Sequence, residues 1–188
     1  MKKYSTIVLI LVGLLLNACF SGDDGITNRF IELRLTDALT FENEGNYVVG
    51  DTIFIELNFS RYLEEEGFTN LLDVYESTNA KSFGYSFRLE KFSELGNSYI
   101  GTTIDGQFLF AEKGRIGPFE TIDVVLNDAE DTYESRIGII LAETGNFRFN
   151  FDFLSIFSQN VDFDKVNIEI QHLFNTAVPE DFEFTVNE

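Results

Sequence analysis

The chain has 188 residues, of which 32 are acidic and 13 are Lys or Arg, so its formal net charge is −19 at pH 7. Nucleic acid is excluded as a partner, because phosphate binding requires a basic stripe and the few cationic residues here are scattered singly. The length suits one large domain or two small ones, and 21 Phe with no Trp predict a core rich in phenylalanine.

The first nineteen residues have the order of a secretory signal peptide. Met1 to Lys3 is a charged start, and Ile7 to Leu16 is an apolar stretch broken only by Gly13. A transmembrane helix needs about 20 apolar residues, so this run is too short for a stable membrane anchor. The stretch closes with Ala18 and Cys19, and Cys19 is the only cysteine of the chain.

This start resembles the precursors of bacterial lipoproteins, in which a signal peptidase cleaves just before a cysteine that carries a diacylglycerol thioether and later an N-acyl chain. The resemblance implies that residues 1–18 are removed and that Cys19 carries the fatty acyl chains, such as palmitate. A lipidated sulfur also avoids the oxidation that threatens an unpaired thiol in an exported protein. The alternative is an ordinary secretory signal that is cleaved after Ala18 and leaves Cys19 as a free thiol.

Residues 19–27 are predicted to form a flexible tether, because they include Asp23, Asp24 and two glycines and offer little to pack. At about 3.3 Å per residue, the tether reaches at most roughly 26 Å from the membrane. Its acidic start is similar to the export signal of surface-exposed lipoproteins of the Bacteroidota type. We therefore expect a lipid-anchored protein on the surface of the bacterial outer membrane, with the periplasmic leaflet as the alternative.

Residues 28–188 are predicted to form a single all-β domain, an antiparallel β-sandwich of immunoglobulin-like character with about ten strands. The segment Tyr47 to Ser60 resembles a pattern common in immunoglobulin-like surface modules. Apolar and polar residues alternate in nearly every segment, which is the period of a half-buried strand. The predicted strands are Ile31–Leu35, Ile53–Phe59, Leu72–Glu76, Ser82–Leu89, Ser98–Ile104, Gln107–Ala111, Ile122–Leu126, Ile137–Leu141, Phe147–Phe153, Val166–Phe174 and Phe182–Val186.

Two local signals refine this pattern. Asp105-Gly106 predicts a type I′ turn that joins the segments on either side into an antiparallel hairpin. Arg61 to Gly67 is the one segment expected to be helical, because Glu64 to Glu66 suit a turn between strands.

No catalytic residue, metal ligand or cofactor is assigned. The single histidine, His172, shares the apolar face of its predicted strand, which favours a hydrogen-bonded histidine at the margin of the core over a catalytic base. Two acidic loops offer oxygen ligands for calcium, although neither has the spacing of an EF-hand and solvated carboxylates are the simpler interpretation. These loops contain Asn127, Asp128, Glu130 and Asp131, and Asn160, Asp162 and Asp164.

The sequence favours a non-enzymatic binding module that contacts a protein, peptide or glycan through loops at one end of the sandwich. A charged partner would be cationic or would be bridged by a divalent metal ion. Without Trp, recognition of a glycan would depend on Tyr or Phe. The alternatives are a hydrolase that uses a pair of carboxylates, a calcium-dependent binding domain and a structural component of the envelope.

Overall fold

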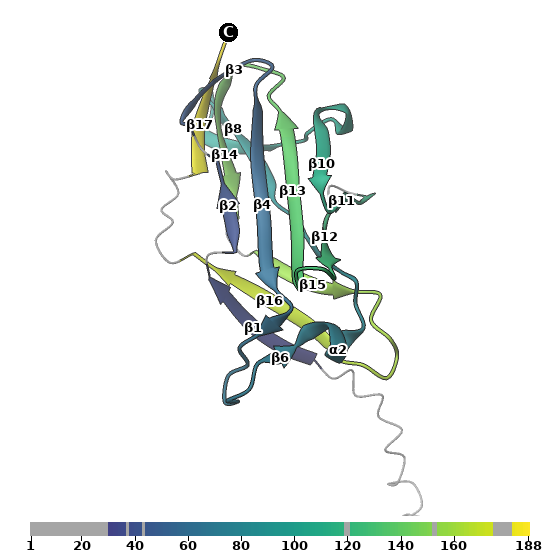
Figure 1. Ribbon diagram of the computed structural model, residues 1–188. Coiled ribbons are helices and arrows are strands. Elements are labelled where there is room, and N and C mark those ends of the chain that lie inside the picture. The colour runs from purple at the N-terminus through teal and green to yellow at the C-terminus, as the bar shows by residue number, and fades with distance from the viewer. Residues whose placement is uncertain (1–29, 37, 43, 119–120, 152–153, 175–181) are drawn as a thin grey trace, which may run out of the picture.

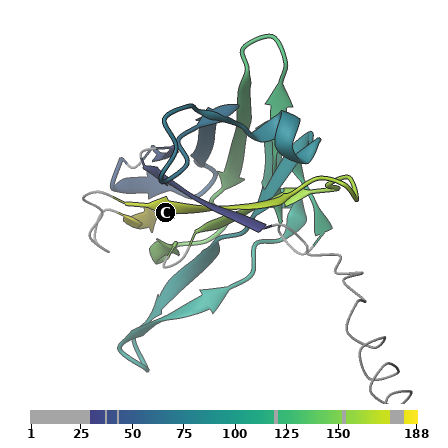
Figure 2. The same ribbon diagram turned by 90° about the horizontal axis from the view of Figure 1, so that it is seen from below.

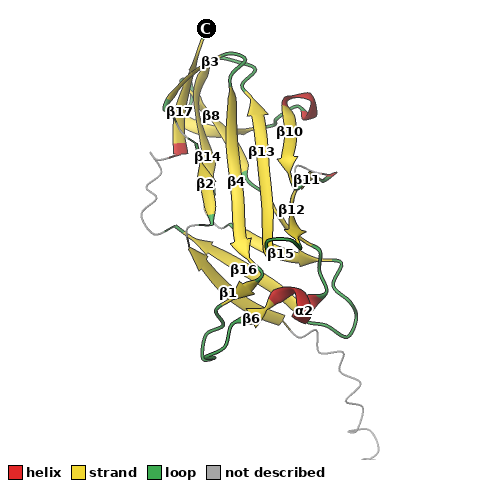
Figure 3. Cartoon of the chain, in the orientation of Figure 1, coloured by secondary structure: helices red, strands yellow, loops and turns green. Residues whose placement is uncertain are grey.

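The computed structural model describes residues 30–36, 38–42, 44–118, 121–151, 154–174 and 182–188. These residues are mostly in strands, with one short α-helix, α2 (Val74–Thr78), and a 3₁₀ turn, η1 (Gly106–Phe108) (Figure 3). The prediction of an all-β fold is confirmed.

The strands form two large sheets and one small one (Figure 1). Sheet A has the order β1 (Phe30–Thr36), β16 (Asn167–Leu173), β15 (Ser155–Gln159), β7 (Ser82–Tyr85), β12 (Ile122–Asn127), β13 (Thr132–Ile140), β4 (Thr52–Ser60) and β2 (Leu39–Phe41), with β10 (Leu109–Lys113) on β13 and β11 (Arg115–Ile116) on β12. Sheet B has the order β3 (Asn46–Val48), β17 (Glu183–Asn187), β14 (Gly145–Asn150), β8 (Arg88–Ser93) and β9 (Ser98–Thr102), and β5 (Tyr62–Leu63) pairs with β6 (Leu72–Asp73).

Both large sheets are mixed, so the expectation of purely antiparallel pairing is wrong in two places. β1 runs parallel to β16 in sheet A, and β3 runs parallel to β17 in sheet B. Each pair joins a strand from the start of the described chain to one near its end. Because no tight turn links such strands, their direction is free of the antiparallel constraint that a hairpin imposes.

Sheets A and B pack through aromatic side chains. The ring centroids of Phe41 in β2 and Phe149 in β14 are 5.0 Å apart, and that of Phe184 in β17 lies 6.2 Å from Phe41. The predicted alternation in β4 is confirmed, with Ile53 to Phe59 burying every second side chain. Full burial of one such apolar side chain contributes about 1.5 to 3 kcal/mol. One cluster of buried residues includes side chains from both sheets.

The segment predicted as one strand from Ser82 to Leu89 is two strands in different sheets. It leaves the strand conformation at Ser86 and Phe87, between β7 of sheet A and β8 of sheet B. All four residues of β7 are buried, so both faces of this strand are covered by other parts of the protein. The alternating pattern continued across the corner because Phe87 still packs on the core.

The hairpin predicted at Asp105-Gly106 is wrong. Asp105 has a φ of −63° and its carboxylate accepts a hydrogen bond from the Gln107 backbone N–H, which begins η1. β9 pairs with β8 through the turn at Glu94 to Asn97, whereas β10 pairs with β13. The short polar side chain of Asp105 therefore stabilises a local turn that competes with the type I′ geometry.

The helix is also in a different place from the one predicted. Arg61 to Gly67 contains β5 and the start of a loop, and Gly67 has a φ of +88°. α2 instead begins after Asp73, whose carboxylate accepts the Glu76 N–H at 2.9 Å, and it ends at Asn79 in the left-handed conformation. The strand predicted for Leu72 to Glu76 is therefore correct only for its first two residues, because the Asp73 cap starts a helix at Val74.

The two ends of the molecule differ. The described chain begins with β1 at the lower end in Figure 1, where the loop between β5 and β6 and the turn between β15 and β16 also lie. The view from below shows the hairpin of β8 and β9 projecting from the body (Figure 2). Within the described ranges, no helix has the length and apolar character needed to cross a membrane.

Candidate functional site

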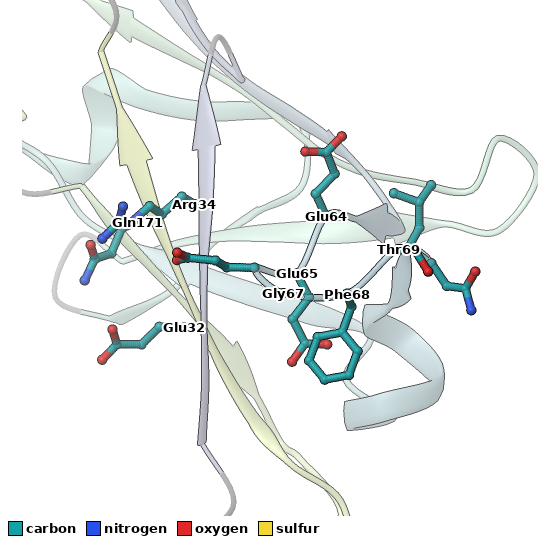
Figure 4. Close-up of a pocket in the computed structure, with 11 residues that line it drawn as sticks. Glu32, Arg34, Glu64, Glu65, Gly67, Phe68, Thr69 and Gln171 are labelled. Carbon is teal, nitrogen blue, oxygen red and sulfur yellow. The ribbon is translucent and has the colours of Figure 1, made fainter.

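A groove of about 580 Å³ lies at the end of the molecule where β1 begins. One wall consists of β1 and β16, which provide Glu32, Arg34 and Gln171. The other wall is the loop Glu64–Leu71, which joins β5 to β6. In Figure 4, the side chains from the strands lie to one side of those from the loop.

The loop is held at its base by a cluster around Arg61. The guanidinium of Arg61 donates to both carboxylate oxygens of Asp73, at 2.8 and 2.6 Å, and to Asp131 at 3.4 Å. The Arg61 guanidinium carbon also lies 5.1 Å from the ring centroid of Tyr75 and 5.5 Å from that of Tyr62. A bidentate pair of this kind has a fixed geometry, so it sets where the loop leaves and rejoins the body.

The same cluster lowers the pKa of the Asp73 carboxyl group. The hydrogen bond from Arg61 is the main cause, and it outweighs the desolvation that would raise the pKa. Because Asp73 also caps α2, its carboxylate connects the helix to the β5–β6 pair. Arg61 extends this connection to Asp131 in the turn between β12 and β13.

The groove contains charged groups that are not paired within the described structure. Arg34 forms no ion pair with any described carboxylate. No described arginine or lysine forms an ion pair with Glu32 or with Glu64 to Glu66. Most other arginine and lysine side chains of the body are paired. The paired ones are Arg61, Lys91, Lys113, Arg115, Arg136 and Arg148.

With four glutamates and one arginine, the groove carries an excess of negative charge. A cationic ligand would therefore be attracted, while Arg34 offers one positively charged group for a carboxylate or carbonyl of that ligand. Gln171, Thr69 and Asn70 add uncharged hydrogen-bonding groups.

Apolar side chains also line the groove. Phe68 and Leu71 of the loop are 69% and 57% exposed, which is unusual for side chains of this size. Their position beside unpaired charges gives the groove both apolar and ionic contacts. Apolar side chains exposed on a concave surface are able to contact the apolar part of a ligand.

The residue assigned to lipid attachment, Cys19, lies outside the described residues, as does the segment 19–27. His172 lies where the sequence predicted it, at the margin of the core with 6% exposure. Its Nε2 atom accepts hydrogen bonds from the backbone N–H groups of Ala38 and Leu39, both at 3.1 Å. This ring nitrogen therefore holds the segment before β2 in place.

The loops considered for calcium are engaged in other contacts. Asn127 donates to Glu134, Asp131 accepts from Arg61, and Asp162 accepts from Asn79. Over the described part of the chain, no group of three or more His, Cys, Asp and Glu side chains is placed to hold a metal ion.

Two further carboxyl groups have lowered pKa values. Burial would raise the pKa of Glu90, but hydrogen bonds from Arg148 and Asn150 outweigh it. A hydrogen bond from Lys113 is the main cause of the lowered pKa of Glu134. A carboxyl group that serves as a general acid needs a raised pKa, so these two groups do not have that property.

The sequence pattern predicted binding loops at one end of the sandwich but did not identify the residues that line the groove. The available signal was the eight-residue stretch Glu64 to Leu71, which lacks the alternation of a strand and carries Phe68 among polar residues. The contributions of Glu32, Arg34 and Gln171 depend on the parallel pairing of β1 with β16, which the sequence did not reveal.

Neither the protein-family models nor the curated proteins gave a match to this chain.

Proposed function

We propose that this protein is a lipid-anchored, non-enzymatic binding module of the bacterial outer membrane, and that its groove binds a cationic, extended segment of a protein or peptide partner. The observation that carries the proposal is the set of glutamates and the arginine that line one groove and form no ion pair with any described residue. Glu65 is half-buried, the others are exposed, and together they surround one concavity, which is the usual form of a ligand site.

The anchor in this proposal is Cys19, after removal of residues 1–18. Two or three acyl chains give an effectively permanent attachment, since each buried methylene contributes about 0.8 kcal/mol. Residues 19–27 are the tether, and 28–188 are one domain, an immunoglobulin-like sandwich, supported by the aromatic contacts between sheets A and B. The acidic tether supports the cell surface over the periplasmic leaflet.

In this proposal the tether sets the distance between the groove and the membrane. The described chain begins at the same end as the groove, so a short tether would hold the groove near the membrane surface. Partners at that height would be neighbouring envelope proteins or peptides that reach the surface. A cationic segment would be drawn in by the net charge of −19 and positioned by Arg34 and Gln171.

The test is a binding titration of the full chain, purified in detergent, with a fluorescent deca-arginine peptide. Glu65→Gln combined with Glu66→Gln is expected to weaken binding by about tenfold, because it removes two charges from the groove. The matched control is Asp128→Asn with Glu130→Gln, which removes two exposed charges from the turn between β12 and β13. Equal losses in the two double variants would contradict a site in the groove, as would an absence of binding.

A hydrolase is the second candidate, because the groove is concave and contains several carboxylates. It predicts turnover of an aryl glycoside by the full chain and loss of that turnover in Glu65→Gln or Glu66→Gln. Such turnover would replace the binding proposal.

A further inference from the structure

The outer face of sheet B carries an ordered set of polar and aromatic side chains. Leu89, Phe149 and Phe184 point inward to the core, so the residues that alternate with them face outward. These outward residues lie on β9, β8, β14 and β17. We call them the sheet B platform, and they are Tyr99, Phe92, Glu90, Arg148, Asn146, Glu183 and Thr185.

The strand register places the platform residues in two rows. In the first row, Phe92 pairs with Tyr99 and Asn146 pairs with Thr185. Phe92 and Asn146 are neighbours, because the residues beside them, Lys91 and Phe147, form a registered pair. The first row therefore presents two aromatic rings, an amide and a hydroxyl group in sequence across four strands.

The second row consists of Glu90, Arg148 and Glu183, which are neighbours across the strands, and it holds Tyr99 of the first row in place. Arg148 donates to Glu90 at 2.7 Å, and the Asn150 amide donates to the other oxygen of Glu90 at 3.1 Å. The Arg148 guanidinium carbon lies 4.4 Å from the ring centroid of Tyr99, and the Tyr99 hydroxyl is hydrogen bonded to Glu183. These contacts hold Tyr99 over the sheet, so little ordering remains to be done when a ligand binds.

The platform is hollowed. A concavity of about 380 Å³ is lined by Phe92, Tyr99, Asn146, Glu183 and Thr185. The rings of Phe92 and Tyr99 are 5.3 Å apart at 70°, so they form two walls of different orientation. Thr185 donates to the Asn146 side-chain oxygen at 2.9 Å, and no described residue accepts a hydrogen bond from the Asn146 amide nitrogen.

We propose that the sheet B platform binds a neutral oligosaccharide. A pyranose ring has an apolar face of C–H groups, which packs on an aromatic ring, and an edge of hydroxyl groups, which needs fixed donors and acceptors. The platform supplies both, with Phe92 and Tyr99 for the face and Asn146, Glu183 and Thr185 for the edge. An uncharged chain is also not repelled by the net charge of −19.

This site is separate from the groove proposed above. It lies on β8, β9, β14 and β17 of sheet B, whereas the groove is built from β1 and β16 of sheet A and the loop Glu64–Leu71. The oligosaccharide proposal therefore does not depend on the peptide proposal, and each can fail alone.

The experiment is calorimetric titration of the full chain in detergent with cellohexaose, maltohexaose and laminarihexaose, three neutral glucose hexamers with different linkages. At least one hexamer is expected to bind. Phe92→Ala is expected to weaken that binding by about tenfold, which corresponds to about 1.4 kcal/mol and is within the range of an aromatic contact. Asn146→Ala, an exposed position with little influence on folding, is expected to weaken it several-fold.

Ile100→Ala is the matched control, because Ile100 is the neighbour of Tyr99 in β9, is 54% exposed and points to the opposite face. Its affinity for the hexamer is expected to equal that of the unchanged protein. Thermal unfolding of each variant identifies losses that arise from misfolding. The proposal is overturned if none of the three hexamers binds. It is also overturned if Asn146→Ala is folded and binds as tightly as the Ile100→Ala control.

Discussion

The ring of Phe110 in β10 occupies the space beside Gly138 in β13 where a side chain at position 138 would stand. The two residues are registered partners, and Phe110 also packs edge-on against Phe54 at 6.0 Å. The missing side chain of Gly138 is therefore what allows β10 to lie on sheet A with its aromatic residue turned onto the sheet.

Gly138→Ala is expected to destabilise the protein by about 1 to 3 kcal/mol, because a methyl group there overlaps the Phe110 ring. Urea unfolding of the full chain measures this cost. The cost should shrink when Phe110→Ala is also present, since the ring is then absent. Gly106→Ala is the matched control because a methyl group there meets nothing within 4 Å. Equal losses at the two glycines would contradict this explanation.

Asp73→Ala is expected to cost about 1 to 3 kcal/mol of stability, since it removes the cap of α2 and the partner of Arg61. The lowered pKa of Asp73 also gives a pH dependence. Its contribution is fully present above the ordinary aspartate pKa of about 4 and is lost as the pH falls through the lower folded value. Chemical unfolding between pH 7 and pH 2 should therefore show a smaller acid-induced loss in Asp73→Ala than in the unchanged protein.

Arg61→Met is expected to weaken binding of the deca-arginine peptide several-fold, although Arg61 does not line the groove. The reason is that the loop Glu64–Leu71 loses the pair that fixes its base. Fluorescence titration measures the affinity, and hydrogen exchange of the loop measures its opening. Unchanged exchange of residues 64–71 would show that the Arg61 cluster does not hold the loop.

Alkaline conditions are expected to destabilise the fold through buried tyrosines. Burial raises the pKa of Tyr85 to about 12, and burial raises the pKa of Tyr133, whose hydroxyl donates to the Ala80 carbonyl at 2.7 Å. Because the unfolded chain ionises near pH 10, stability is complete below that pH and falls as the pH rises toward the folded values. In Tyr85→Phe, the decline of unfolding free energy between pH 10 and 12 should be shallower. An identical decline would assign the alkaline transition to other groups.

The sequence predicted the elements whose pattern depends on burial of one face. β4, β14 and β16 have their apolar residues turned to the core as expected, with Ile55, Phe149 and Ile170 among the most buried. The prediction from sequence failed where a local turn or a long-range strand pairing determines the course of the chain. At Asp105 a side-chain hydrogen bond starts a 3₁₀ turn, and at Ser86 the chain changes sheets although its alternation continues.

The groove was beyond prediction for the same physical reason. Its loop wall is visible as a break in the alternation, but its strand wall depends on β1 pairing in parallel with β16, more than a hundred residues away in the chain. Alternation predicts which side chains share a face and gives no information about which strands become neighbours.

Anchoring by acyl chains on Cys19 is the proposal on which the envelope location depends, and mass spectrometry of the protein from membranes of cells that express the full chain tests it. After trypsin digestion, we expect a peptide from Cys19 to Arg29 that carries a diacylglycerol thioether and an N-acyl group. A peptide that begins elsewhere, or an unmodified Cys19 at its start, would rule out this anchor.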